Sequence, residues 1–157
     1  MDINRFTESA QQGLSAAQSK AARYGNQQVD VEHLLASLLE QERGLAGSIF
    51  NKTEIDTDAV RQRVEQELQR LPKVAGPTGA PDQIYVTGRL NRLLAQAEDE
   101  AKKLRDDYIS VEHLLLAMTP TMTEVMGATG RIFHEFGVTR ERLMRALQEV
   151  RGSQRVT

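Results

Sequence analysis

The chain has 157 residues, the size of one ordinary domain, and its 22 acidic and 20 Lys or Arg side chains give a formal net charge of −2. This balance excludes the basic field expected of a nucleic-acid-binding domain. The absence of cysteine excludes disulfides and thiolate metal sites. Because neither a signal-peptide pattern nor an apolar run of membrane-spanning length is present, we expect a soluble, cytoplasmic protein.

Four helices are predicted in the first 71 residues. The first covers residues 6–24, where apolar and small side chains recur at spacings of three and four. Gly25-Asn26 ends this helix, and Asp30 is the predicted N-cap of a second helix that Gly44 ends. A short helix near residues 45–50 and a fourth helix, capped by Asp56 or Thr57, complete the set.

A linker is predicted over residues 72–85. Half of the ten residues from 72 to 81 are Pro or Gly, which favours neither helix nor strand. The helical pattern resumes over residues 86–104, and Ser110 is the predicted N-cap of a helix that ends at Met118, before Pro120. Thr139 caps a last helix that reaches residue 150, whereas residues 151–157 have no periodicity and are expected to form a weakly anchored connector.

The two halves are copies of one unit. Val31-Glu32-His33-Leu34-Leu35 recurs 80 residues later as Val111-Glu112-His113-Leu114-Leu115. After this motif the offset becomes 83, and Gly47-Ser48-Ile49-Phe50 matches Gly130-Arg131-Ile132-Phe133. The sequence therefore predicts an all-α fold of about eight helices, with repeat one at 1–71 and repeat two at 86–150, within a single unit 1–150. Because one copy alone would be marginally stable, we expect the copies to share an interface.

The doubled Glu-His pair admits a structural and a catalytic interpretation. A zinc-protease helix carries two His four residues apart, whereas each copy here has one. We favour the structural role, with Glu32 and Glu112 at the positive end of a helix dipole and His33 and His113 bonded locally. No Gly-rich loop is followed by the Lys-Ser/Thr pair of a nucleotide-binding P-loop, so we expect no catalysis, no metal and no cofactor in this chain.

The two Val-Glu-His-Leu-Leu motifs, the junction Arg70-Leu71-Pro72-Lys73-Val74 and the ending 150–157 resemble the Clp N-terminal domain family. The resemblance covers essentially the whole chain. The duplicated motif is shared with the protease-linked ClpA and ClpC types, while the junction and the ending favour the disaggregases of the ClpB type. The resemblance implies a pseudo-two-fold all-helical domain that precedes an AAA+ ring, in a homohexameric parent that uses ATP and Mg, whereas the fragment itself is expected to be a monomer.

The resemblance also implies a function and a site. Domains of this type bind unfolded or aggregated polypeptide and pass it to the pore of the ring, and the parent works with cooperating chaperones. By position, Thr7, Asp106 and Glu112 are the polar candidates for polypeptide binding, although Thr7 also fits a helix cap. Gln96, Glu100 and His113 occupy positions where an apolar groove lining is expected.

Two alternatives remain open at this stage. One is an adaptor-docking domain of a protease-linked Clp ATPase of the ClpC or ClpA type. The other is a small metal-dependent enzyme that uses the Glu32/His33 and Glu112/His113 pairs.

Overall fold

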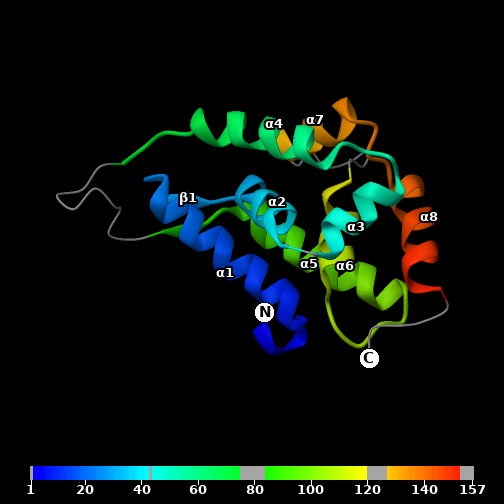
Figure 1. Cartoon of the computed structure of the whole chain (residues 1–157). Coiled ribbons are helices and arrows are strands. Elements are labelled where there is room, and N and C mark those ends of the chain that lie inside the picture. The colour runs from blue at the N-terminus through cyan, green and yellow to red at the C-terminus, as the bar shows by residue number, and fades with distance from the viewer. Residues whose placement is uncertain (1, 43, 75–83, 120–126, 153–157) are drawn as a thin grey trace.

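The computed structural model describes residues 2–42, 44–74, 84–119 and 127–152 (Figure 1). The described residues form eight α-helices and three shorter elements, which confirms the predicted all-α class. The first copy contains the 3-10 helix η1 (Ile3–Arg5), α1 (Glu8–Arg23), β1 (Gln28–Val29), α2 (Val31–Glu40), α3 (Leu45–Lys52) and α4 (Thr57–Gln69). The second copy contains β2 (Tyr85–Val86), α5 (Gly88–Lys103), α6 (Val111–Met118), α7 (Gly127–Glu135) and α8 (Arg140–Arg151).

Short polar side chains set the starts of the helices, as the sequence predicts. The Asp56 carboxylate accepts from the Ala59 N–H at 3.1 Å, and the Thr139 hydroxyl accepts from the Arg142 N–H at 3.2 Å. Gly25, with φ +72°, follows the end of α1 in the left-handed conformation that glycine adopts readily. One boundary differs from the prediction, because α8 continues to Arg151 and so includes the first residue of the expected connector. Gly152 follows as the C-cap of α8, whereas the other connector residues, 153–157, and most of the predicted linker, residues 75–83, lie outside the described residues.

The copies are tied together by reciprocal strand pairing, which the sequence does not predict. β1 pairs in parallel with β2, and Phe6 forms a parallel bridge with Ile109. In both cases the segment before the first helix of one copy meets the segment before the second helix of the other. The Thr87 N–H donates to the Val29 carbonyl at 3.2 Å, and at the equivalent place the Thr7 N–H donates to the Ile109 carbonyl at 2.9 Å. Two-residue strands are too short to show a period, so only the folded chain reveals them.

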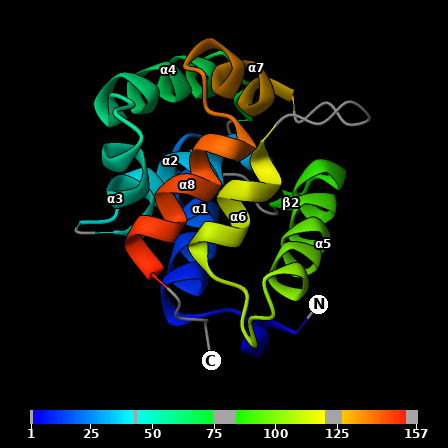
Figure 2. The same ribbon diagram turned by 90° about the vertical axis from the view of Figure 1, so that its right-hand side faces the viewer.

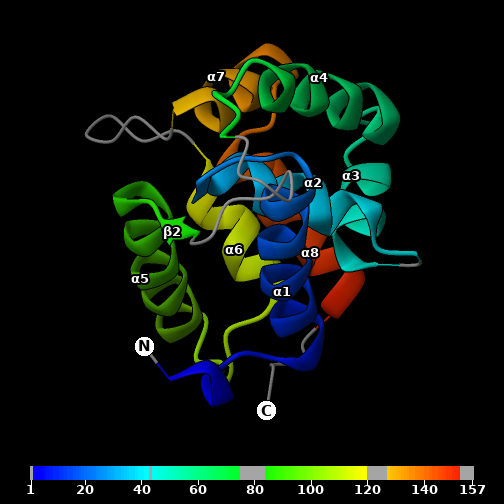
Figure 3. The same cartoon turned by 90° about the vertical axis from the view of Figure 1, so that its left-hand side faces the viewer.

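Helices of each copy also pack on helices of the other, so the two copies form one shared core. α3 packs on α8 and α4 packs on α7, which lie side by side in Figures 2 and 3. At the centre, the equivalent residues Phe50 and Phe133 meet edge to face, with ring centroids 6.2 Å apart. Both rings are fully buried. The expected interface between the copies is therefore confirmed, because the third helix of each copy packs on the fourth helix of the other.

No helix in the described parts of the chain has the length and apolar character needed to cross a membrane. α2 and α6 are buried almost all round, whereas α5 has a buried and an exposed face. Its buried positions are Leu90, Leu93, Ala97, Glu100 and Ala101, at spacings of about three and four residues. The inclusion of a buried glutamate in this stripe points to ionic contacts inside the domain.

Candidate functional site

The duplicated motif builds two capping boxes, which confirms the structural role expected for its His residues. His33 and His113 are each the third residue of their helix, and the N–H of the capping residue donates to the ring Nδ1. The distances are 2.9 Å from the Asp30 N–H to His33 and 2.8 Å from the Ser110 N–H to His113. This reciprocal arrangement satisfies backbone donors that a helix start otherwise leaves unpaired.

The second ring nitrogen distinguishes the two copies. Because Nδ1 accepts a hydrogen bond in both rings, Nε2 carries the proton. The His33 Nε2 lies 2.9 Å from the Asn26 Oδ1, whereas the His113 Nε2 lies 2.7 Å from the Asp106 Oδ2. Burial lowers the pKa of His33 to about 4, so this ring is neutral at pH 7. Both nitrogens of both rings are thus engaged within the domain, which disfavours the metal-dependent enzyme as an interpretation of the motif.

In the second copy, an arginine from α8 completes a buried polar cluster. The Arg151 guanidinium contacts the Asp106 carboxylate, and its Nε lies 3.6 Å from the Glu112 Oε2. The Glu112 Oε1 also accepts from the Ser110 hydroxyl. Arg151 is 14% exposed, whereas the side chains of Asp106 and Glu112 are 0% and 4% exposed. We call Asp106, Ser110, Glu112, His113 and Arg151 the acidic cluster.

The structure brings four of the six predicted site residues together. Asp106, Glu112 and His113 belong to the acidic cluster, and Thr7 is joined to the same segment by its hydrogen bond to Ile109. The Thr7 hydroxyl accepts from the Ala10 N–H at 3.3 Å, so the residue is also the N-cap of α1. The sequence did not single out Arg151, because α8 meets α6 only through tertiary packing.

Glu100 and Gln96 lie apart from this cluster on α5. The Glu100 side chain is 1% exposed and is bound by the Arg140 guanidinium through both carboxylate oxygens. Arg140 and Arg151 are at opposite ends of α8, about 16 Å apart along the helix axis. Glu100 and the fully buried His113 therefore form part of the interior, and their assignment to polypeptide binding stays a prediction. Gln96 is half-buried.

Exposed apolar side chains flank the acidic cluster along the chain. Ile3 lies in η1 and precedes Thr7 along the chain. Tyr108 lies between Asp106 and Ser110, and Val150 is adjacent to Arg151. The side chains of Ile3, Tyr108 and Val150 are exposed. η1, the α5–α6 connection and the end of α8 meet at one end of the molecule in Figures 2 and 3. This end therefore combines a buried acidic cluster with accessible apolar surface.

The equivalent position in the first copy carries a different ionic pattern. The Asp30 carboxylate accepts from the Val31 N–H at 2.8 Å and from the Thr87 hydroxyl at 2.9 Å, and it contacts the Arg89 guanidinium. Burial alone would raise the pKa of Asp30, but these hydrogen bonds, led by that from Arg89, outweigh burial and lower it. Glu32 accepts from the Thr129 N–H at 3.2 Å, and burial raises its pKa.

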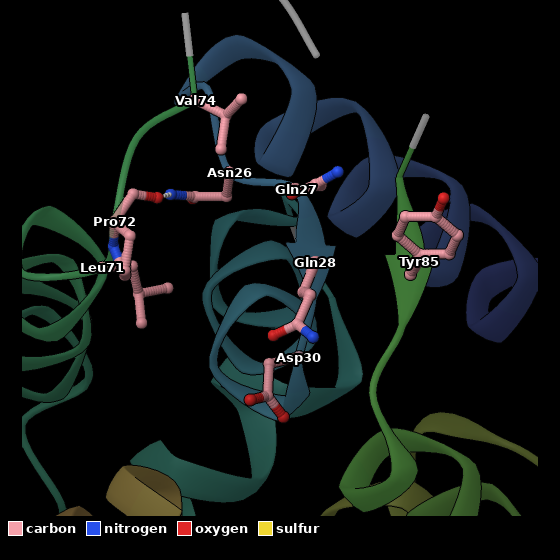
Figure 4. Close-up of a pocket in the computed structure, with 8 residues that line it drawn as sticks. All are labelled: Asn26, Gln27, Gln28, Asp30, Leu71, Pro72, Val74 and Tyr85. Atoms are coloured by element: carbon pink, nitrogen blue, oxygen red, sulfur yellow. Dashed lines mark hydrogen bonds between the residues drawn. The ribbon is translucent and has the colours of Figure 1, made fainter. Parts of the chain in front are cut away.

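A cavity of about 440 Å³ opens beside this first-copy cluster (Figure 4). Three carboxamide side chains and an aromatic ring surround it, together with an apolar wall that follows α4. Its lining residues are Asn26, Gln27, Gln28, Asp30, Leu71, Pro72, Val74 and Tyr85. This cavity could not be predicted from the sequence, because its walls come from three segments that are separated along the chain.

Comparison with known proteins places this arrangement in a family. Residues 5–136 match the family model described as the Clp repeat (R) N-terminal domain. The chaperone protein ClpB of Nitratidesulfovibrio vulgaris is 43% identical over 157 residues, which are 100% of this chain and 18% of that protein. ClpB of Bacillus anthracis is 44% identical with the same coverage. The chain thus spans about a fifth of the length of these relatives.

Solved structures show the same fold. The Hsp104 N-terminal domain from Candida albicans has a TM-score of 0.79 at 23% identity and covers 96% of this chain and 94% of its own. The N-terminal domain of the ClpV1 ATPase from E. coli EAEC has a TM-score of 0.77 at 24% identity, with coverages of 97% and 88%. With the family match over residues 5–136, these findings show that the chain belongs to the Clp repeat N-terminal domain family.

Proposed function

We propose that the chain is the polypeptide-recognition domain of a ClpB-type disaggregase, a longer protein whose AAA+ ring uses ATP and Mg. In this proposal the domain is non-catalytic, binds unfolded or aggregated polypeptide and passes it to the ring. Whole-chain similarity to ClpB proteins supports the assignment to this type of protein. The observation that carries the binding role is the exposure of Ile3, Tyr108 and Val150 next to the acidic cluster, because accessible apolar side chains are what a client with unburied apolar segments would contact.

The burial of the acidic cluster defines how its residues would take part. Arg151 covers both carboxylates, so Asp106 and Glu112 reach a bound polypeptide only when the Arg151 side chain moves outward. Thr7 is half-buried and is not part of the acidic cluster. We therefore assign first contact to the apolar side chains and Thr7, with the carboxylates engaged after displacement of Arg151.

Binding of this kind is expected to be weak. The apolar patch is small, and association costs translational, rotational and side-chain freedom, so we expect affinities between about micromolar and millimolar, or roughly −8 to −4 kcal/mol. Weak single contacts suit a ring that carries several copies of the domain. Together the copies hold an aggregate by avidity, while each one can release its segment for threading.

Chemical-shift mapping of the labelled chain with a permanently unfolded protein and with its native form tests this proposal. We expect shifts at residues 3–9 and 106–112 with the unfolded form alone. Thr7→Ala and Glu112→Gln should weaken binding, whereas the equivalent changes in the other copy, Thr87→Ala and Glu32→Gln, serve as matched controls. Loss of the Thr7 cap should cost about 1 kcal/mol and leave Tm within a few degrees.

Two results would contradict the proposal. Shifts that avoid both segments would remove the site. An equal response to native and unfolded protein would instead favour docking of a folded partner, as in the adaptor-binding alternative.

A further inference from the structure

The strand β1 has an unused edge. The Tyr85 N–H donates to the Gln27 carbonyl at 2.8 Å and the Thr87 N–H donates to the Val29 carbonyl, so these groups face β2. Alternate residues of a strand direct their backbone groups to opposite edges, and the Gln28 N–H and carbonyl therefore point away from β2. No residue in the described ranges forms a hydrogen bond with either group. Gln28 is exposed, so a donor and an acceptor are available side by side.

The cavity of about 440 Å³ lies at this unused edge. In Figure 4, β2 and Tyr85 stand on one side of β1, while Leu71, Pro72 and Val74 stand on the other. Two hydrogen bonds fix this second wall in place: the Val74 N–H donates to the Gly25 carbonyl at 2.7 Å, and the Asn26 side chain donates to the Pro72 carbonyl at 3.1 Å. The space is therefore bounded by a backbone edge and by an anchored apolar segment.

The chemistry of the lining selects a class of ligand. Among the described residues that line the cavity, Asp30 is the only charged one, and Arg89 already neutralises it. None of these described lining residues is cationic, which argues against a phosphate or nucleotide. The side chains of Gln27 and Gln28 are exposed and can both donate and accept, as the backbone of an extended polypeptide requires. An uncharged, extended segment of polypeptide fits these features.

The distribution of exposed apolar side chains supports a second site here. Over the described parts of the chain, six large apolar side chains are exposed, and three of them flank the acidic cluster. The other three, Val74, Tyr85 and Val86, are at the cavity or next to it. Each group of three exposed side chains therefore lies near one of the two strand pairings between the copies, β1 with β2 or Phe6 with Ile109.

We propose that the cavity and the Gln28 edge form a second polypeptide-binding site, which takes an extended, uncharged segment as an added strand beside β1. The backbone of Gln28 holds the segment, and its apolar side chains contact Leu71, Val74 and Tyr85. This inference rests on the proposed function, because it assumes that the domain meets unfolded polypeptide. A client held at both sites would gain affinity through the effective concentration of its second segment.

Titration of the isotopically labelled 157-residue chain with a short uncharged peptide of β-branched and small residues tests the second site. We expect shifts at Gln28, Val29, Leu71 and Val74, and nuclear Overhauser contacts between the Gln28 amide and the peptide. The same peptide with alternate amides N-methylated cannot pair with the edge and should bind about fivefold more weakly, as expected for the loss of one hydrogen bond.

Two variants at one position provide the matched comparison. Gln28→Pro removes the free donor without breaking a hydrogen bond inside the domain, and proline is tolerated on an edge whose N–H is unpaired. It should bind the peptide about fivefold more weakly than Gln28→Ala, which lacks the same carboxamide but retains the backbone donor. Should Gln28→Pro fail to fold, the N-methylated peptide still decides the question.

The outcomes separate this site from the proposed function. Equal binding of the normal and N-methylated peptides, or no shift at Gln28 at saturation, would overturn the second site. If shifts then appear only at residues 3–9 and 106–112, the proposed function stands without it. Shifts confined to the cavity would support the second site and refute the assignment of client binding to the acidic cluster.

Discussion

Titration of His33 should link the stability of this domain to pH. The ring is fully buried; its Nδ1 accepts from the Asp30 N–H, and its Nε2–H donates to Asn26, both at 2.9 Å. A second proton on Nδ1 would meet the Asp30 N–H and break the capping box. Burial is the largest cause of the lowered pKa, and the positive charge of Lys20 adds to it.

The direction and size of the effect follow from the two pKa values. The unfolded chain binds a proton on this His near pH 6.5, whereas the folded chain does so only near pH 4. The free energy of unfolding is therefore highest above pH 6.5 and falls as the pH decreases through this window. The shift corresponds to about 3 kcal/mol, or roughly 6–12 °C in Tm for a domain of this size.

His33→Gln is the informative variant, because glutamine at the third helical position can still accept from the Asp30 N–H but does not titrate. Urea unfolding across the window should show the parent losing about 3 kcal/mol more than this variant as the pH falls. The difference between the two curves isolates His33 from Glu32, whose raised pKa has the opposite sign: its contribution is present at low pH and is lost as the pH rises. His134→Gln, at an exposed position, is the matched control for the loss of a histidine side chain.

Parallel curves for the parent and His33→Gln between about pH 4 and pH 6.5 would refute this reasoning. His33→Ala distinguishes the cap from the titration. It leaves the Asp30 N–H without its acceptor and should cost a further 1–3 kcal/mol or so at every pH.

Three further predictions follow from the core and the sequence. Arg140→Ala removes the partner of the buried Glu100 and should lower the free energy of unfolding by about 2 kcal/mol, a value reduced because Arg140 is 43% exposed. Arg92→Ala, at an exposed position, is the control, and its free energy of unfolding should stay within about 0.5 kcal/mol of the parent value in the same urea titrations. In a double-mutant cycle of Phe50→Leu and Phe133→Leu, we expect a coupling of about 1 kcal/mol, and strict additivity would contradict the edge-to-face contact. Calorimetric titration with Mg-ATP should give no binding heat, since the sequence has no P-loop, and saturable binding would contradict this expectation.

The local part of this structure could be predicted from the sequence. The caps Asp30, Ser110 and Thr139, the glycine after α1 and the pairing of α1–α4 with α5–α8 all follow from short-range chemistry and from the repeated motif. A capping residue acts on backbone groups within three positions of itself, so its effect is visible in the sequence. The resemblance to the family likewise indicates Thr7, Asp106 and Glu112 as candidates for polypeptide binding.

Which helix faces and which charged side chains meet depends on the packing of the folded chain. Helical periodicity indicates that a face is buried but does not identify the helix that covers it. The packing of α3 and α4 on helices of the other copy could therefore not be predicted. For the same reason the sequence does not indicate that the guanidinium of Arg151 closes the acidic cluster. It likewise does not indicate that Arg140 holds Glu100 inside the core. Such long-range contacts depend on the relative placement of helices, which is set by the packing of the whole core rather than by any local stretch of the chain.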